Sequence, residues 1–292
     1  MHLLRVLVLA NIPFFVTAFY SSNLVPTSRR NLPGCLRGSV VMVQTRPASV
    51  DVLHANPKAA PIRIRSFNRA TDEAAVHVIF AEGMMQMVSS GFAALFNALA
   101  PLVAAACAIL SAVAWSLGVG PVATVLAFVV PLSAAMMGLR LYLARMIRNY
   151  VDKSISDDLA DIDGFYMATP KSHFWVAVVG EKDGGDEVLG CVALESKSDS
   201  EDNKDRRGWG ELRRMSVAKS GRRRGVASLL NAALLAHAQQ QHLKGVFLST
   251  STMQPDAIAL YSRLEYKQVS LTPFPNRILE RAIQFALFEK AL

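Results

Sequence analysis

The longest uncharged run of the chain, Gly83–Leu139, constrains its fold more than any other feature. None of its 57 residues carries a charged side chain. A bilayer core is about 30 Å thick and needs about 20 helical residues per crossing, so this run is long enough for two spans and a turn. Gly118-Val119-Gly120-Pro121 predicts the turn. We therefore expect a transmembrane hairpin over residues 91–143, with helices near Phe92–Leu117 and Pro121–Leu143.

Basic residues flank this run on both outer sides. They are Lys58, Arg63, Arg65 and Arg69 before it, and Arg140, Arg145, Arg148 and Lys153 after it. Segments rich in Lys and Arg stay on the non-translocated side of a membrane, so both outer ends are predicted to face that side. The lipid bilayer is then a partner of the chain. A single span, and two core helices of a large soluble fold, are the alternatives.

The first 50 residues predict a targeting presequence. Met1–Arg5 is a short basic start, and Val6–Tyr20 is an apolar stretch of 15 residues, which is short for a span and suits a signal-peptide core. Tyr20–Val50 is rich in Ser and Arg and contains no acid, as transit peptides do. A signal followed by a transit segment resembles the bipartite presequence of complex plastids. Plastid delivery, insertion at the endoplasmic reticulum and an uncleaved anchor are all open.

Charge and metal-ligand spacing argue against two further classes of function. The chain has a net charge of +8, but five of its arginines and no acid lie in the first 50 residues, so the rest is only weakly basic. This balance does not imply a nucleic-acid partner. The three cysteines and six histidines show no ligand spacing, so neither a metal site nor a disulfide framework is indicated.

The segments on either side of the hairpin predict parts of one soluble unit. Pro61–Phe67 alternates apolar and basic residues like a half-buried strand, and Thr71-Asp72-Glu73 begins a helix. These two elements assign residues 61–90 to the unit. After the hairpin, Phe174–Val179 and Val188–Leu194 predict two strands joined by a turn.

A strand, a glycine-bearing loop and a helix follow one another between residues 211 and 242. Glu211–Val217 alternates like a strand, and Ser228–His242 has an apolar stripe near helical spacing. The loop between them carries an arginine triplet, Gly225 and Ala227. Unpaired amides at the start of a helix bind anions, and arginines add charge-assisted contacts to phosphate. The loop is neither a Walker loop nor a dinucleotide fingerprint, and a basic triplet is also typical of a solvated face.

Three motifs of this region resemble those of the GNAT superfamily of acyl-CoA N-acyltransferases. They are Glu211-Leu-x-Arg214-Met-x-Val217, Arg222-x-x-Gly225-x-Ala227 and Ala257-Ile-Ala-Leu-Tyr261-x-x-Leu264. The resemblance implies an α/β (α+β) fold with a central mixed sheet, formed here by residues 61–90 and 150–292. A two-helix transmembrane hairpin inserted after the first strand and helix is similar to the camello-like membrane-bound N-acetyltransferases.

The resemblance also implies which residues bind acetyl-CoA, the expected co-substrate, with no metal. The pantetheine arm is expected on Met215, Ser216 and Val217, and the pyrophosphate on Arg222, Arg223, Arg224, Gly225, Val226 and Ala227. Gln254 stands where many members have Asn near the cofactor tip. In the family, a tyrosine at the position of Tyr261 protonates the leaving thiolate. In some members an acid of the strand that holds Glu211 takes the amine proton through a water.

Each catalytic candidate has a structural alternative. Tyr261 also has the spacing of a core residue, and a glutamate at a strand start, like Glu211, is commonly only solvated. The pattern departs from the family after the last motif, where Glu265-Tyr266 replaces the usual Gly-Phe. Glutamate tolerates a positive φ poorly, so we expect this turn to be strained or differently shaped.

Together these patterns predict a membrane-anchored N-acetyltransferase that moves an acetyl group from acetyl-CoA to a primary amine of a protein or a small molecule. The alternative is a catalytically silent membrane protein that keeps the fold to bind CoA or a partner. Asn276–Leu292 has apolar residues on one face and predicts a C-terminal amphipathic helix. Such a helix covers core, lies on a membrane or pairs with a partner, so a homodimer is also open. Nothing in the sequence identifies the acceptor.

Overall fold

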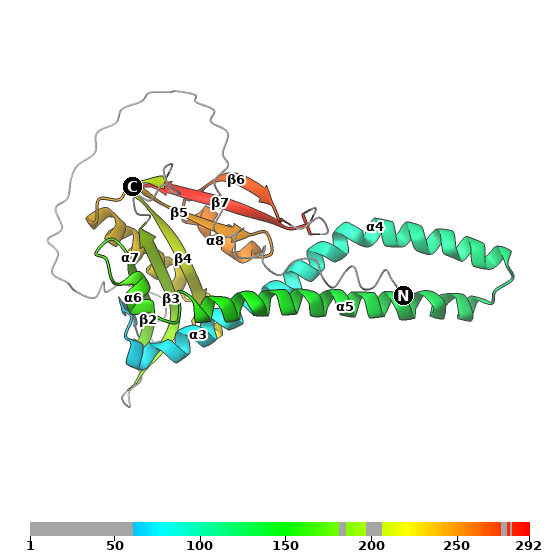
Figure 1. Cartoon of the computed structure of the whole chain (residues 1–292), viewed down its shortest axis with the longest axis horizontal. Coiled ribbons are helices and arrows are strands. Elements are labelled where there is room, and N and C mark those ends of the chain that lie inside the picture. The colour runs from blue at the N-terminus through cyan, green and yellow to red at the C-terminus, as the bar shows by residue number, and fades with distance from the viewer. Residues whose placement is uncertain (1–60, 181–184, 197–205, 276–278, 281) are drawn as a thin grey trace, which may run out of the picture. The chain divides into compact units, whose positions relative to one another are not determined.

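The computed structural model describes residues 61–180, 185–196, 206–275, 279–280 and 282–292. The predicted presequence, residues 1–50, lies outside the described residues. The described part begins with a strand and a helix, continues into two long helices, and ends with a mixed series of strands and helices. This order confirms the predicted α/β (α+β) fold interrupted by a helical hairpin (Figure 1).

One seven-stranded mixed sheet forms the centre of the domain (Figure 1). In spatial order its strands are β1 (Ile62–Ser66), β2 (His173–Gly180), β3 (Asp186–Ser196), β4 (Trp209–Val217), β5 (Gly245–Ser251), β7 (Gln284–Ala291) and β6 (Lys267–Pro273). Neighbouring strands are antiparallel except β4 and β5, which run parallel. A parallel pair needs a crossover connection, and helix α7 (Val226–Gln240) supplies it.

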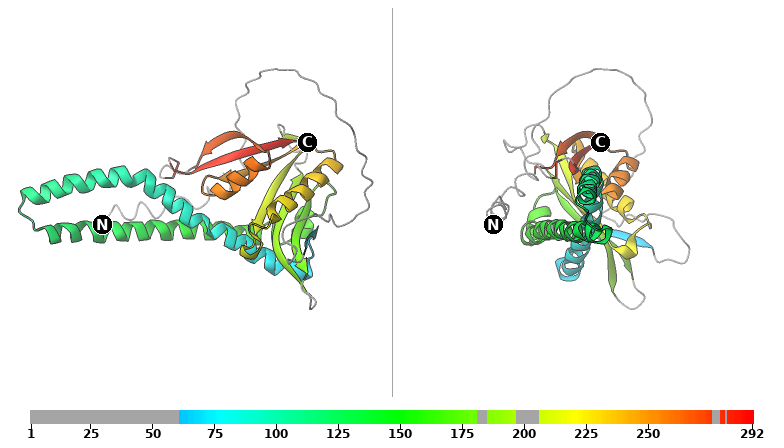
Figure 2. Two further views of the ribbon diagram at one scale, coloured as in Figure 1. Left: turned by 180° about the vertical axis from the view of Figure 1, so that it is seen from behind. Right: turned by 90° about the vertical axis from the view of Figure 1, so that its right-hand side faces the viewer.

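Helices cover both faces of the sheet (Figure 2). Besides α7 they are α3 (Arg69–Met85), α6 (Ile162–Tyr166) and α8 (Pro255–Arg263), with a short 3-10 turn η2 at Lys219–Gly221. On one face, Leu230 of α7 is buried in the same hydrophobic cluster as Trp175 of β2. On the other face, Phe174 of β2 packs against Phe67 and Tyr166. Side chains alternate along a strand, so β2 contributes to both layers of core.

Two long helices, α4 (Met87–Ser116) and α5 (Pro121–Ser156), extend from the sheet as an antiparallel pair (Figure 1). The predicted turn lies between them and contains Gly118, which has a φ of 70°. Both are long and apolar enough to cross a bilayer, and only 6% and 0% of their apolar windows are buried. A core helix of a soluble protein is mostly buried, so these helices differ from that class.

The C-terminal segment is a strand, and the predicted amphipathic helix over Asn276–Leu292 is wrong. Gln284–Ala291 forms β7, which lies between β5 and β6 and pairs with both. Its successive residues Ala286, Leu287 and Phe288 are all buried. A strand covered on both faces has a continuous apolar run in place of strict alternation, and over a short window such a run also fits helical spacing.

Candidate active site

The parallel strands β4 and β5 pair only over their first residues and then separate (Figure 1). The paired positions are Trp209 with Gly245, Gly210 with Val246 and Glu211 with Phe247. Beyond them β4 stays paired with β3, and β5 with β7. Within the described part of the chain, the β5-facing edge of Leu212–Val217 therefore has no strand partner. Unpaired strand edges offer their amide and carbonyl groups to extended ligands.

A β-bulge interrupts β4 in the middle of this unpaired edge. The register shifts between the pair Cys191–Ser216 and the pair Ala193–Arg213, and Arg214 has a φ of 56°. A bulge inserts one residue and re-aims the backbone and side chains beside it. Arg213 and Arg214, although adjacent, consequently lie close to the same carboxylate, that of Asp158. The predicted pantetheine-binding residues follow this bulge directly.

Arg214 anchors the bulge to the end of α5 through a buried network that the sequence did not reveal. Its guanidinium donates to Asp158 Oδ2 at 2.8 Å, to Ser154 Oγ at 3.0 Å and to Tyr150 Oη at 3.1 Å. Tyr166 donates to the same carboxylate. Burial raises the pKa of Asp158, but the hydrogen bonds and charge of Arg214 outweigh burial, and the net effect lowers it. The pair therefore stays ionised, and Asp158 lies in a stretch without any motif that signals it.

The predicted pyrophosphate loop is the junction between β4 and α7. Gly225 caps α7 with a φ of 79°, a left-handed conformation that glycine adopts readily. Among the described residues, the amides of Arg223, Arg224 and Gly225 donate to no other group. The first amides of α7 add to them, because a helix start leaves its amides without intrahelical acceptors. The loop thus presents a row of amides at the positive end of the helix dipole.

The arginines of this loop are open to an anion. Arg222 and Arg223 are exposed and Arg224 is partly exposed. None of the three forms an ion pair with another residue that the structure describes. Val226, in contrast, is 1% exposed and fixes the start of α7 in the hydrophobic cluster. A diphosphate fits this combination of free amides and unpaired guanidinium groups.

Tyr261 lies on α8, the helix that follows the separated end of β5. Its side chain is 5% exposed, and its ring packs against Tyr266 and Phe288, with centroids 5.7 and 6.2 Å apart. Tyr261 and Leu212 belong to the same hydrophobic cluster, and Met215 packs against this cluster. Tyr261 is therefore on the α7 side of the sheet. Burial raises the pKa of Tyr261 above its ordinary value, so its hydroxyl keeps the proton that an acid must donate.

Gln254 lies at the start of α8, directly before Pro255. Its side-chain Oε1 accepts a hydrogen bond from Thr250 Oγ1 at 2.9 Å, and its backbone N–H donates to the Ser251 carbonyl at 2.8 Å. Both contacts connect Gln254 to the last two residues of β5. Its role at the cofactor tip stays a prediction.

Glu211 lies at the closed end of the opening. It is the last β4 residue that pairs with β5, and on the other side it is opposite Glu195 of β3. Its neighbour Leu212 points into the cluster that contains Tyr261. Because side chains alternate, Glu211 faces the opposite side of the sheet from Tyr261. The two predicted catalytic residues are thus placed on different faces.

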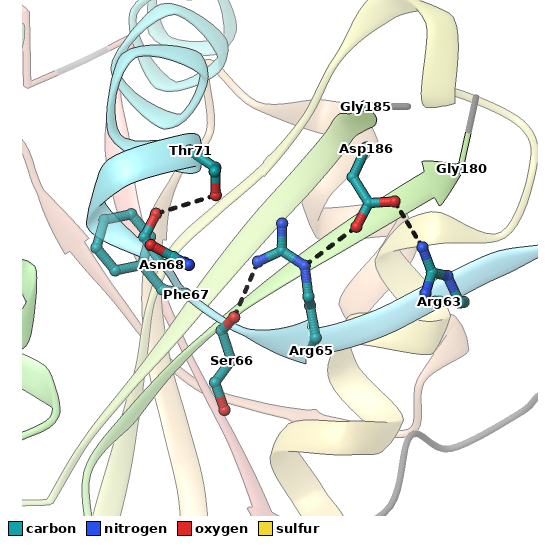
Figure 3. Close-up of a pocket in the computed structure, with 9 residues that line it drawn as sticks. All are labelled: Arg63, Arg65, Ser66, Phe67, Asn68, Thr71, Gly180, Gly185 and Asp186. Carbon is teal, nitrogen blue, oxygen red and sulfur yellow. Dashed lines mark hydrogen bonds and ion pairs between the residues drawn. The ribbon is translucent and has the colours of Figure 1, made fainter. Parts of the chain in front are cut away.

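A shallow polar pocket lies elsewhere, beside β1 (Figure 3). It is lined by Arg63, Arg65, Ser66, Phe67, Asn68, Thr71, Gly180, Gly185 and Asp186. Arg63 is paired with Asp186 at 2.5 Å, and Arg65 with the buried Asp72 at 2.6 Å. These carboxylates neutralise both arginines, and no predicted site residue lines the pocket, so we do not assign acetyl-CoA to it. Across the described residues, no three His, Cys, Asp or Glu side chains gather closely enough to hold a metal ion.

Comparison with known proteins identifies the same region. A profile of the acetyltransferase (GNAT) family matches residues 141–266. Human N-acetylaspartate synthetase is 34% identical over 215 residues, which are 73% of this chain and 65% of that protein. N-acetylaspartate synthetase from Xenopus tropicalis is 35% identical over 137 residues, 47% of this chain and 46% of that protein. N-acetyltransferase 8B from Rattus norvegicus is 34% identical over 122 residues, 41% of this chain and 51% of that protein.

The chain spans about half to two thirds of the length of these curated relatives. The residues matched by the family profile contain all three motifs, the separated strands β4 and β5, and the loop at the start of α7. They also include the end of α5, where Asp158 and Arg214 meet. Residues 141–266 therefore form an acetyltransferase domain of the GNAT family.

Proposed function

We propose that this protein is a membrane-anchored enzyme that transfers the acetyl group of acetyl-CoA to a primary amine by direct attack. The observation that carries the proposal is the unpaired edge of β4 beside the loop Arg222–Ala227. CoA is an extended arm that ends in a diphosphate. A free strand edge suits the arm, and free amides with unpaired arginines suit the diphosphate.

Direct transfer makes three demands on the residues around the opening. As the C–N bond forms and the C–S bond breaks, the carbonyl oxygen gains negative charge, the thiolate needs a proton and the amine must lose one. We propose that backbone amides of Met215–Val217 stabilise the charge on the carbonyl oxygen. Tyr261 donates the proton to the thiolate. Glu211, through a water, receives the amine proton. The opposite placement of Glu211 and Tyr261 on β4 and α8 supports an acid and a base acting from two sides.

The role of Tyr261 is tested by Tyr261→Phe, which keeps the ring contacts and removes the hydroxyl. General-acid catalysis contributes about 10²–10⁴ in rate, so we expect kcat to fall at least 100-fold with CoA affinity unchanged. Thiol release from acetyl-CoA and calorimetric CoA binding measure the two quantities. If Tyr261→Phe and the unaltered protein had equal kcat, Tyr261 would be only a residue of the hydrophobic core.

The pyrophosphate loop is tested by Gly225→Ala against a matched control, Gly118→Ala. Both glycines have positive φ, 79° and 70°, and a Cβ at either would meet nothing within 4 Å. Each substitution therefore carries the same backbone cost, about 1–2 kcal/mol. Only Gly225→Ala is expected to weaken CoA binding, by about tenfold, since it alone alters the amide row. Equal CoA affinity in the two variants would contradict the assignment.

The membrane anchor is proposed from the hairpin of α4 and α5. Pro121–Leu139 has no charge and rises about 28 Å as a helix, close to the thickness of a bilayer core. Arg140, Arg145 and Arg148 follow at once and are exposed. Recovery of the protein in the pellet after carbonate extraction is the expected result. The N-terminus of the mature protein would then discriminate plastid from endoplasmic-reticulum delivery.

The acceptor is proposed from the relatives alone. Two of them are named N-acetylaspartate synthetase, and aspartate is accordingly the first amine to assay. A panel of other amino acids, polyamines and peptides with free N-termini or lysines follows. Turnover with any of them supports the enzyme, whereas CoA binding without turnover on the whole panel would favour the catalytically silent alternative.

A further inference from the structure

The first helix of the hairpin lies against the segment that follows β5. We call Thr250–Gln254 the β5 lip, because it comprises the last two residues of β5 and the three that follow them. Ser90 Oγ on α4 donates a hydrogen bond to the Met253 carbonyl. A Cβ on Gly91 would lie 2.6 Å from Met253 Sδ and 3.9 Å from Leu143 Cδ1 of α5. Gly91 is therefore the point where α4, α5 and the β5 lip meet, and a side chain there would displace the buried side chain of Met253.

The second helix of the hairpin holds the other strand. We call Arg213–Val217 the β4 lip. Tyr150 and Ser154 on α5, with Asp158 just after it, bind the guanidinium of Arg214. This side chain leaves β4 from the bulged residue itself, at a φ of 56°. The shape of the bulge is thus tied to the end of α5.

The α3–α4 segment contacts both lips. At the end of α3, Gly83 approaches Ser216 of the β4 lip, since a Cβ there would lie 3.6 Å from Ser216 Oγ. Gly91 on α4 approaches the β5 lip. Along a continuous helix the eight-residue separation of Gly83 and Gly91 corresponds to about 12 Å. The α3–α4 segment therefore contacts both lips of the opening that the separated strands create.

We propose that the hairpin is the frame of the active site, in which α4 holds the β5 lip and α5 holds the β4 lip. The packing of α4 on α5 then sets the distance between the lips, and with it the alignment of Tyr261 with the thioester. Ser90, Gly91 and Arg214 are positioning residues in this account. It rests on the proposed acetyltransferase function and adds a reason for the hairpin beyond anchoring.

The frame predicts a split between turnover and cofactor binding. The pyrophosphate loop is held by Val226 in the α7-side cluster, away from the contacts of Ser90 and Gly91. Moving the β5 lip should therefore misalign α8 without changing the loop. Small misplacements of reacting groups lower rates by up to about 100-fold. We expect Gly91→Ala to lower kcat about tenfold and to leave the Kd of CoA within twofold.

The experiment uses the full chain in lipid vesicles, with Gly138→Ala as the matched control. Gly138 lies on α5 of the same hairpin, and a Cβ there would meet nothing within 4 Å. This control should keep the kcat of the unaltered protein. Adding Met253→Ala to Gly91→Ala makes room for the new methyl group, and we expect the pair to recover most of the lost kcat. Such non-additivity separates a specific contact from general destabilisation.

Each outcome decides something. Equal kcat in Gly91→Ala and Gly138→Ala, or a double variant no better than Gly91→Ala, would overturn the frame and leave the acetyltransferase intact. Absence of thiol release from the unaltered protein on every amine would overturn the proposed function. The frame would then be judged by amide hydrogen exchange in residues 250–254. Faster exchange in Gly91→Ala than in Gly138→Ala supports the frame, and equal exchange rejects it.

Discussion

A single residue carries the strain at the end of α8. Glu265 has a φ of 64°, in the left-handed region where helices usually place glycine. Its amide donates to the Ser262 carbonyl at 3.2 Å, and the Tyr266 amide donates to the Tyr261 carbonyl at 3.0 Å, which closes the helix. Its carboxylate is 3.3 Å from Lys290 Nζ, but the side chain is 84% exposed, so this pair contributes little. The turn expected from the sequence is confirmed as a glutamate at positive φ.

Relief of this strain is the first prediction. Glu265→Gly should raise the free energy of unfolding by about 0.5–1 kcal/mol, because glycine adopts this conformation without a Cβ clash. Thermal unfolding in detergent measures the change. Glu265→Ala is the control, since it loses the contact with Lys290 and keeps the strain. A glycine variant no more stable than the alanine variant would show that the backbone is not strained here.

A pair of histidines makes the stability depend on pH. Burial, and then the charge of His237, lower the pKa of His173 to about 4. The two rings stack with centroids 5.4 Å apart, and His173 Nε2 is 2.8 Å from Ser66 Oγ. The unfolded chain takes up a proton near pH 6.5, whereas the folded chain does so only near pH 4. Stability should therefore fall as the pH falls from about 6.5 to 4.

The size of this loss is limited because His173 is partly exposed. We expect about 1–2 kcal/mol after allowing for solvent screening. Unfolding temperatures measured at pH 7.5, 5.5 and 4.5 give the curve. His173→Gln should flatten the part of the curve that belongs to this ring. A curve of the same shape in the variant would assign the pH dependence to other groups.

At the scale of elements, the opening depends on a tight junction at its closed end. Gly245 pairs with Trp209 of β4 and with Ala291 of β7, so three strands meet at one residue. A Cβ on Gly245 would lie 2.7 Å from the Lys290 carbonyl oxygen and even closer to the Trp209 ring. Backbone atoms cannot move aside as a flexible side chain does. The strands can separate beyond this junction because they are held closely within it.

Filling the junction is accordingly expected to be costly. Gly245→Ala should lower the free energy of unfolding by about 1–3 kcal/mol through overpacking. Gly185→Ala is the control, because a Cβ there would meet nothing within 4 Å. Chemical denaturation of both variants gives the comparison. If the two lost equal stability, the closed end would tolerate more volume than these distances allow.

At the scale of the whole molecule, the proposal that the hairpin spans a bilayer can be tested with a single charge. Val130 lies near the middle of the uncharged part of α5 and is 62% exposed. An arginine at the centre of a span costs about 2.5–3.5 kcal/mol on insertion. Val130→Arg should therefore move much of the protein into the soluble fraction after carbonate extraction. Asn149→Arg, an exposed position outside that part, should remain in the pellet, and equal behaviour of the two would argue against a spanning hairpin.

Local patterns were sufficient for much of the molecule. The uncharged run and its Gly-Pro turn predicted the hairpin, and the spacing around Gly225 predicted a helix start with free amides. The glutamate after α8 predicted a strained turn. Each of these features depends on a few neighbouring residues, because periodicity, dihedral preference and helix-end chemistry act over one or two turns of chain.

Tertiary structure decided what depends on residues far apart in the chain. The sequence did not reveal that β7 is a strand between β5 and β6, because burial on both faces removes the alternation that marks a strand. It did not pair Arg214 with Asp158 or Ser90 with Met253, since such contacts are chosen by which surfaces meet. The separation of β4 from β5, which forms the candidate site, is likewise decided by contacts between distant parts of the chain. Sequence determined the helical hairpin, the start of α7 and the chemistry of the loop before it, and only packing decided where the opening lies and which residues contact its two strands.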